Sequence, residues 1–258
     1  MNAKILVAAH KPYRMPDDEL YYPVQAGAVL SKQAFGFSKD DTGDNISAKN
    51  PQFSELTVLY WGWKNLECDY LGLVHYRRHF SRRKAKGDVW NSVLTAVQAK
   101  ELLCGTDVLL PKKRHYWIET LSSHYGHTHD ATHLDALRSV IGEESPDYLP
   151  VYDRVMQQRS AHMFNMFLMK RDVADAYCSW LFKVLFRLEN EIDATGLDSF
   201  DARLFGRVSE FLLDVWLEKN EIQYKEVGVV YTEPVNYGKK IAAFLRAKFG
   251  GKKYKHSF

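Results

Sequence analysis

The sequence predicts a single α/β domain whose C-terminal half is rich in helices. Short apolar segments alternate with longer amphipathic ones, and two segments near the C-terminus are long and strongly periodic. No internal repeat, low-complexity segment or linker divides the chain. With 258 residues, 46% of them hydrophobic, the chain is large enough to bury one sizeable core.

The predicted strands are short runs of apolar residues that end in polar or basic turns. The first, "KILVAAH", places His10 and Lys11 at its carboxyl end, where open α/β sheets bind ligands. Two long polar segments follow it, and long loops in compact domains usually carry function or are disordered. Further strands are predicted over residues 70–76, 106–114 and 224–234.

The predicted helices show apolar residues at a helical period. In "SELTVLYWGWKNL" the apolar positions Leu56, Leu59 and Trp63 share one face, and Ser54 is the expected N-cap. The segments with the strongest periodicity lie in the second half of the chain. Helices are therefore expected over residues 54–66, 131–141, 172–192 and 201–220.

Composition and charge exclude several classes of protein. No apolar run is long enough for a transmembrane helix, and the motifs of nucleic-acid-binding domains are missing. Three widely spaced cysteines without a signal peptide favour a reducing cytoplasm. Residues 234–258 form a basic tail that alternates apolar and cationic residues. This tail is either an amphipathic segment that lies on an anionic membrane surface or a solvated terminus.

The stretch "HYRRHF" places unusual charge at the end of a buried strand. Arg77 and Arg78 are suited to bidentate binding of phosphate or carboxylate, whereas an ion-paired surface turn is the alternative. Strand alternation predicts His75 and Arg77 on one side, and Tyr76 and Arg78 on the other. A second basic turn, "PKKRHYW", contributes Lys112 and Arg114 after the next strand. Convergence of the two turns at one sheet edge favours an anionic ligand.

Two polar stretches are candidate binding loops. In "DDTGDNIS" the side chains and backbone of Asp41, Thr42, Gly43, Asp44 and Asn45 can hold ribose, base or sugar hydroxyls; a surface loop rich in Asx turns is the alternative. In "SSHYGHTHDATH" four histidines suggest zinc. The frames of known zinc sites are absent, so hydrogen bonding of hydroxyl groups by imidazoles is the preferred interpretation.

Polar residues inside apolar segments supply the remaining candidates. His162 and Asn165, with Met163 between them, lie in "RSAHMFNMFLMK", and buried polar side chains there require partners. On the last long helix, Asp201 and Glu210 are nine residues apart and face different directions. A carboxylate that faces cations is a candidate general base, although a helix salt bridge is the commoner role.

Six ordered motifs carry a resemblance to a known family over residues 4–233. The chain resembles the DUF4422 family of bacterial polysaccharide-biosynthesis glycosyltransferases, and the tail after residue 233 lies outside the resemblance. The motifs are "AAHKPYRMP", "DDTGDNISAKNPQFSELTVLYWGWKN", "YLGLVHYRRHF", "LLPKKRHYWIETLSSHY", "RSAHMFNMFLMK" and "WLEKN".

This resemblance implies a GT-A-like nucleotide-binding domain and a hexosyltransferase activity. The implied donor is UDP-galactofuranose or UDP-galactopyranose, and the implied acceptor is a polyprenyl-linked glycan of capsule, O-antigen or exopolysaccharide synthesis. GT-A enzymes commonly hold Mn²⁺ or Mg²⁺ with an Asp-x-Asp motif at the end of the central strand. Here Arg77, Arg78 and His75 occupy that place, so fixed cations are expected to replace the metal or to accompany it.

The resemblance also suggests roles for the other candidate residues. His10, Lys11 and the 41–45 loop are expected to hold the nucleoside, and the two basic turns the diphosphate. The segment "ETLSSHY", with Thr120, His124 and Tyr125, and "SAHMFN" are expected to shape the sugar and acceptor pocket. Glu210 is the first candidate for the base, followed by Glu119 and Asp201. The alternatives are a non-catalytic protein that binds sugar nucleotides or glycans, and a hydrolase that uses the histidines with a metal.

Overall fold

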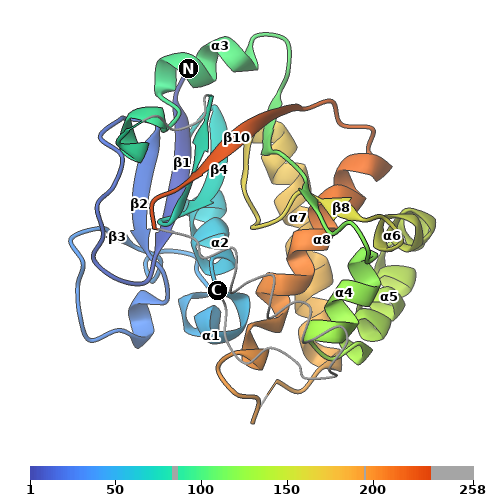
Figure 1. Ribbon diagram of the computed structural model, residues 1–258. Helices are drawn as coiled ribbons and strands as arrows, with labels where there is room; N and C mark the ends of the chain where they lie inside the picture. The colour runs from blue at the N-terminus through green and yellow to red at the C-terminus, as the bar shows by residue number, and fades with distance from the viewer. Residues whose placement is uncertain (83–86, 195, 234–258) are drawn as a thin grey trace.

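The computed structural model describes residues 1–82, 87–194 and 196–233, and over these ranges it is a single mixed α/β domain. In Figure 1 the sheet occupies the left half and helices α4 to α8 the right half. The strands are β1 (Ala3–Ala9), β2 (Tyr21–Gln25), β3 (Ser38–Lys39), β4 (Tyr70–His75), β5 (Arg78–Ser81), β6 (Val108–Pro111), β7 (Arg114–His115), β8 (Ser160–Ala161), β9 (Phe167–Lys170) and β10 (Lys225–Tyr231). The helices are α1 (Asn50–Phe53), α2 (Leu56–Asn65), α3 (Ala96–Leu103), α4 (Leu121–Thr128), α5 (Thr132–Glu144), α6 (Leu149–Met156), α7 (Arg171–Glu191) and α8 (Leu204–Lys219).

The main sheet joins a parallel half to a mixed half, in which β10 and β6 pair parallel and the other pairs are antiparallel. Its strand order is β3-β2-β1-β4-β5-β10-β6-β9, with β9 also paired to β4, and β7 and β8 form a separate two-stranded sheet. Strands β1, β2, β3 and β4 run parallel. Their carboxyl ends therefore lie at one edge, where ligands bind in open α/β sheets.

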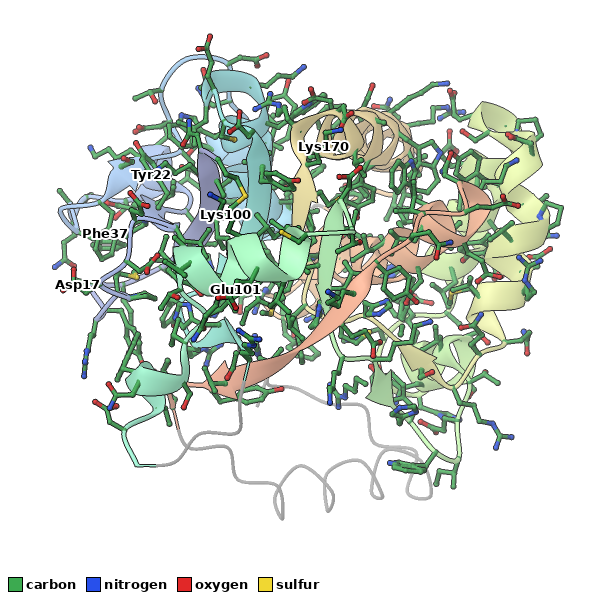
Figure 2. The ribbon with its side chains drawn as sticks, turned by 90° about the horizontal axis from the view of Figure 1, so that it is seen from above. Asp17, Tyr22, Phe37, Lys100, Glu101 and Lys170 are labelled. Carbon is green, nitrogen blue, oxygen red and sulfur yellow. The ribbon has the colours of Figure 1, made fainter. Side chains whose placement is uncertain are left out.

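Strand β1 is buried on both faces. Helices cover one face of the sheet, and other segments, α3 among them, cover the opposite face. Leu6 and Ala8 belong to the larger core, which packs against α2, α5, α6, α7 and α8. Ile5 and Val7 face a smaller core that includes Leu103 of α3. The view from above in Figure 2 shows α3, with the labelled Lys100 and Glu101, lying across the amino-terminal end of the parallel strands.

Most predicted elements are confirmed. The long periodic segments form α7 and α8, and residues 225–231 form the predicted last strand. None of the helices in the described ranges is long and apolar enough to cross a membrane. The basic tail of residues 234–258 lies outside the described residues, so the predicted boundary at residue 233 and the membrane role of the tail stay predictions.

Two local predictions are wrong. Ser54 does not cap α2: its backbone has φ 52° and ψ −129°, and Glu55 is the residue that flanks the helix. The strand at "YLGLVHY" ends at His75, and a tight turn leads directly into β5. His75 and Arg78 are therefore paired across this hairpin and lie on the same face of the sheet, contrary to simple alternation.

Candidate functional site

The β4–β5 hairpin brings two arginines to the carboxyl edge of the parallel strands. Its turn is formed by Tyr76 and Arg77, and the Arg77 backbone N–H donates to Nδ1 of His75 at 3.3 Å. His75 is buried, and burial lowers the pKa of its imidazole well below the usual value, with Arg78 and Arg77 lowering it further. His75 is accordingly neutral at pH 7, and since its Nδ1 accepts from Arg77, its Nε2 carries the proton and can donate one hydrogen bond.

The two arginines retain buried donors that meet no acceptor among the described residues. The Nε atoms of both Arg77 and Arg78 are buried without a hydrogen-bond partner. The Arg78 guanidinium lies 4.3 Å from the ring centroid of Phe164, and one Arg77 terminal nitrogen is 3.6 Å from the Glu233 carboxylate. A buried unsatisfied donor is unfavourable, so these guanidiniums are suited to receiving an anionic group.

Glu210 of α8 lies within electrostatic reach of Arg78. Burial raises the pKa of the Glu210 carboxyl to about 7, and the charge of Glu55 adds to that rise. Arg78, a hydrogen bond from the backbone N–H of Phe164, and Arg114 act in the opposite direction. A carboxyl group with a pKa near neutrality exchanges protons readily at the working pH, which is the property of a general base.

Glu55 is a second carboxylate in this group, and the sequence analysis did not identify it. It is buried, and its Oε1 atom accepts a hydrogen bond of 2.8 Å from Nδ2 of Asn165. Its charge acts on Glu210, Arg78 and His10. A glutamate just before a helix is common on protein surfaces, so nothing in the local sequence marked this one as buried.

His10 and Arg203 complete the arrangement. The ring centroids of His10 and His75 are 6.0 Å apart. Desolvation lowers the pKa of His10, the Glu55 charge opposes this effect, and Arg203 and Arg77 lower it further, although part of the side chain stays exposed. Arg203, like Glu55, was not among the site residues predicted from the sequence. We call His10, Glu55, His75, Arg77, Arg78, Arg203 and Glu210 the charged cluster.

Strained backbone lies beside both carboxylates. Phe164 and Asn165 have φ values of 78° and 53°, and Ser54, which precedes Glu55, has a φ of 52°. The Asn165 amide also donates to the Gly206 carbonyl at 3.0 Å, which helps hold the turn. Left-handed conformations of residues other than glycine are unfavourable and concentrate at functional sites. The observed strain therefore supports a functional role for this cluster.

The residues of the "DDTGDNIS" loop lie along α2 and not in the charged cluster. The Trp61 indole N–H donates to the Thr42 hydroxyl at 2.9 Å, and Asn65 exchanges hydrogen bonds with the backbone of Asp44. Asn65 is ten residues from Glu55, or about 15 Å along the helix. Asn45 donates within the loop to Gly43, and Asp41 is partly buried. Nucleoside binding by this loop stays a prediction.

Arg114 connects the second basic turn to the cluster. Its guanidinium lies 5.1 Å from the ring centroid of Tyr116, and its charge acts on Glu210 and on His124. The Tyr116 and His124 ring centroids are 4.3 Å apart. The two basic turns thus both reach Glu210 electrostatically. Lys112 is exposed, and its backbone N–H donates to the Val227 carbonyl.

The other two candidate bases are engaged by neighbouring side chains. Glu119 is buried, and its two oxygens meet Nδ1 of His124 at 2.9 Å and Nδ1 of His127 at 2.6 Å. Burial raises the pKa of Glu119, but the hydrogen bonds from both histidines outweigh that effect, and the net pKa is lowered. Asp201 lies 3.9 Å from Nδ1 of His129 and from a terminal nitrogen of Arg207.

The remaining candidates lie at several separate places in the fold. Asn165 lies at the cluster, and Met163 packs into the core. His162 is fully buried, with Nδ1 at 2.5 Å from Asp214 and Nε2 at 3.0 Å from Glu226. The rest have the following contacts: Thr120 caps α4, the Tyr125 hydroxyl meets Nδ1 of His133, and Lys11 pairs with Glu233 at 3.2 Å.

The histidine-rich segment does not gather its imidazoles around one point. His124 and His127 share Glu119, whereas His129 lies near Asp201 and His133 contacts Tyr125. Over the described ranges, no group of three or more His, Cys, Asp or Glu residues is placed to hold a metal ion. The guanidinium groups of Arg77 and Arg78, which stand at the end of β4, are cationic and cannot coordinate a divalent metal.

Comparison with known proteins gives one family and one similar structure. The model of a family described as a domain of unknown function, DUF4422, matches residues 4–221. A solved structure, described as the WbbM bifunctional glycosyltransferase in its apo form, is similar with a TM-score of 0.84 and 27% sequence identity. The similarity covers 91% of this chain but 46% of that one, so the chain corresponds to about half of that protein. No curated protein sequence matches.

Proposed function

Since the chain belongs to the DUF4422 family and has the fold of part of a bifunctional glycosyltransferase, we propose that it is a glycosyltransferase that uses a nucleotide-sugar donor. The observation that carries this proposal is the pair of arginines at the end of β4. Their buried Nε atoms meet no acceptor among the described residues, and the charge of Arg78 acts on the Glu210 carboxyl, whose pKa is about 7. A diphosphate and an acceptor hydroxyl are the two groups that such a site would handle.

We assign the donor diphosphate to Arg77 and Arg78. Guanidinium groups bind phosphate oxygens with paired hydrogen bonds, and the buried Nε atoms supply donors that have no hydrogen-bond partner in the described part of the chain. In this position the two charges stabilise the negative charge that develops on the departing nucleoside diphosphate. His10 and Arg203 lie beside them, so the nucleoside would extend along the carboxyl edge of β1.

Glu210 is the proposed general base of an inverting transfer. Its carboxylate removes the proton of the acceptor hydroxyl as the hydroxyl oxygen bonds to the anomeric carbon. The bond from that carbon to the phosphate oxygen breaks, and the nucleoside diphosphate leaves with the bonding electrons. The Phe164 N–H and Asn165, which holds Glu55, keep the two carboxylates in place. Loss of the positioned base should lower turnover by about 10²–10⁴-fold.

The finer assignment rests on the family resemblance. We propose UDP-galactofuranose or UDP-galactose as the donor and a lipid-linked glycan of capsule, O-antigen or exopolysaccharide synthesis as the acceptor. Donors that differ in one hydroxyl or in ring form are distinguished by contacts within the sugar pocket. Screening UDP-, GDP- and dTDP-sugars by thermal shift, with and without divalent metal, tests the nucleotide first.

Substitution of the arginines tests the diphosphate assignment. Arg77→Ala and Arg78→Ala should each weaken UDP binding by about 10–100-fold, because a hydrogen bond to a charged group is worth about 1.5–3 kcal/mol. Arg82→Ala is the matched control, since Arg82 is exposed and pairs with Glu101. Transfer by the native protein should persist in excess EDTA. A strict requirement for Mn²⁺ or Mg²⁺ would contradict the role given to the arginines.

Glu210→Gln tests the base independently of donor binding. The variant should bind UDP as the native protein does and lose transfer, and the native pH profile of kcat/KM should rise through an apparent pKa of about 7. An active Glu210→Gln variant rules out Glu210. If the native protein binds UDP-sugars but neither hydrolyses nor transfers them, the chain is a binding protein and not a transferase.

A further inference from the structure

The segment after β7 presents two large apolar side chains to solvent next to each other in the sequence. The side chain of Trp117 is 78% exposed and that of Ile118 is 52% exposed. Burial of a tryptophan normally stabilises a fold strongly, because the indole is one of the largest apolar surfaces in a protein. Adjacent exposed residues of this size indicate a surface that is covered in another state of the protein.

The backbone holds this exposure in place. The Ile118 N–H donates to the Tyr116 carbonyl at 2.6 Å, and Trp117 between them has a φ of 57°. This is the form of γ-turn with positive φ, which is rare and strained. Arg159 anchors the turn at its base: its carbonyl accepts from the Tyr116 N–H at 2.8 Å, and its guanidinium donates to the Trp117 carbonyl at 3.2 Å. The projecting indole is therefore imposed by the surrounding structure.

Cationic side chains lie before the apolar tip and at its base, and one carboxylate, that of Glu226, accepts from the backbone N–H of Lys113 at 3.3 Å. Lys112 and Arg114 are exposed immediately before it, and Arg159 is exposed at its base. The nearest acidic side chain in the sequence, Glu119, is buried between two histidines and contributes no exposed charge to this surface. We call residues 112–118 the Trp117 loop. A tryptophan and an aliphatic residue at the tip, with lysine and arginine behind them, match the side chains that anchor proteins at membrane interfaces.

We propose that the Trp117 loop docks the protein on an anionic lipid bilayer. The Trp117 and Ile118 side chains enter the boundary between headgroups and acyl chains, while the cations behind them contact anionic headgroups. The loop joins this surface to the charged cluster, because the charge of Arg114 acts on Glu210 and Tyr116 lies within reach of the same carboxylate's charge. Docking would thus present that carboxylate to molecules held at the membrane.

The proposal does not require the chain to be a transferase, since lipid binding is measured without donor or acceptor. A glycan platform, in which the indole stacks on a sugar ring, is the rival for the same side chain. The neighbouring Ile118 and the exposed cations favour lipid, because an aliphatic side chain gains most by entering an apolar phase and the cations gain from anionic headgroups.

Vesicle co-sedimentation of the full chain tests the proposal. The vesicles are phosphatidylcholine alone and phosphatidylcholine with an equal part of phosphatidylglycerol. The variants are Trp117→Ala combined with Ile118→Ser, and separately Arg114→Gln. The matched control is Val97→Ser, because Val97 is 70% exposed but lies on α3, across the amino-terminal end of the parallel strands (Figures 1 and 2). The basic tail is present in every variant, so its own attraction to lipid is common to all of them.

We expect the native protein to bind the anionic vesicles and the double variant to bind them at least about tenfold more weakly. Arg114→Gln should weaken binding by about fivefold, and added salt should reduce this difference. Val97→Ser should bind as the native protein does. Equal binding by the native protein and the double variant overturns the proposal, as does failure of the native protein to bind. Loss of affinity for a soluble oligosaccharide with unchanged vesicle binding assigns the loop to glycan.

Discussion

Replacing Glu210 with glutamine should stabilise the fold at alkaline pH while removing the proposed base. The carboxyl pKa is raised from 4.5 to about 7 in the folded protein, first by burial and then by the charge of Glu55. Between these two values the folded state holds a proton that the unfolded state releases. The free energy of unfolding therefore falls as pH rises through this window, and glutamine, which is neutral at every pH, avoids that loss.

The magnitude follows from the size of the shift. A difference of 2.5 pKa units, from 4.5 to about 7, corresponds to about 3.5 kcal/mol once the carboxyl is fully ionised in both the folded and the unfolded state, at about 1.4 kcal/mol per unit. At pH 5 only about 1 kcal/mol of this has been lost, because the unfolded state is then partly protonated. The advantage of the glutamine variant should thus grow by about 2.5 kcal/mol between pH 5 and pH 8.5.

Urea unfolding at both pH values measures this difference directly. Thermal melting should show the same effect. The melting temperature of the variant minus that of the native protein should be about 4–8 °C larger at pH 8.5 than at pH 5. Glu67→Gln serves as the control, because Glu67 is exposed and its backbone carbonyl accepts from Asn2, just before the amino-terminal end of β1. Transfer assays on the same samples show whether the substitution that raises stability also lowers the rate of transfer.

A stability difference that is the same at both pH values would refute the reasoning. It would mean that the Glu210 carboxyl ionises alike in the folded and unfolded states, so that neither its burial nor its repulsion with Glu55 is as strong as the structure indicates. A glutamine variant that loses stability relative to the native protein between pH 5 and pH 8.5 would contradict even the sign of the pKa shift. It would show that the charge of Arg78 and the Phe164 N–H outweigh desolvation.

Four other substitutions test how the scaffold is held. Gly62→Ala should lower the free energy of unfolding by about 1–3 kcal/mol in urea titrations, because its Cβ would lie 2.3 Å from a methyl carbon of Leu6. Gly142→Ala, inside α5 with 3.6 Å of clearance, should instead be neutral or stabilise by up to about 1 kcal/mol. Asp40→Ala should lower the melting temperature strongly, since the buried carboxylate accepts from two backbone N–H groups and two hydroxyls, and each orphaned donor costs about 1–3 kcal/mol. Thr95→Ala should cost about 1 kcal/mol by removing the capping box of α3, and hydrogen exchange in that helix should rise.

Elements with strong local periodicity were predicted from the sequence, and those set by turn geometry were not. The spacing of apolar residues sufficed for α7, α8 and β10, because one buried face repeats within a few residues. The hairpin after His75 was misread. The two-residue turn depends on the pairing of β5 with β10, which lies more than 140 residues later in the chain. No feature of the sequence near the turn indicates that pairing.

By itself, the sequence predicted the α/β class and the cationic end of β4, and the family resemblance made Glu210 the first candidate for the base, which stays a prediction. The tertiary structure alone placed Glu55 and Arg203 beside them. Helical periodicity and charge type are properties of neighbouring residues, so they can be read along the chain. Desolvation and Coulomb interactions depend on which groups are close in space, and here those groups come from segments about 150 residues apart.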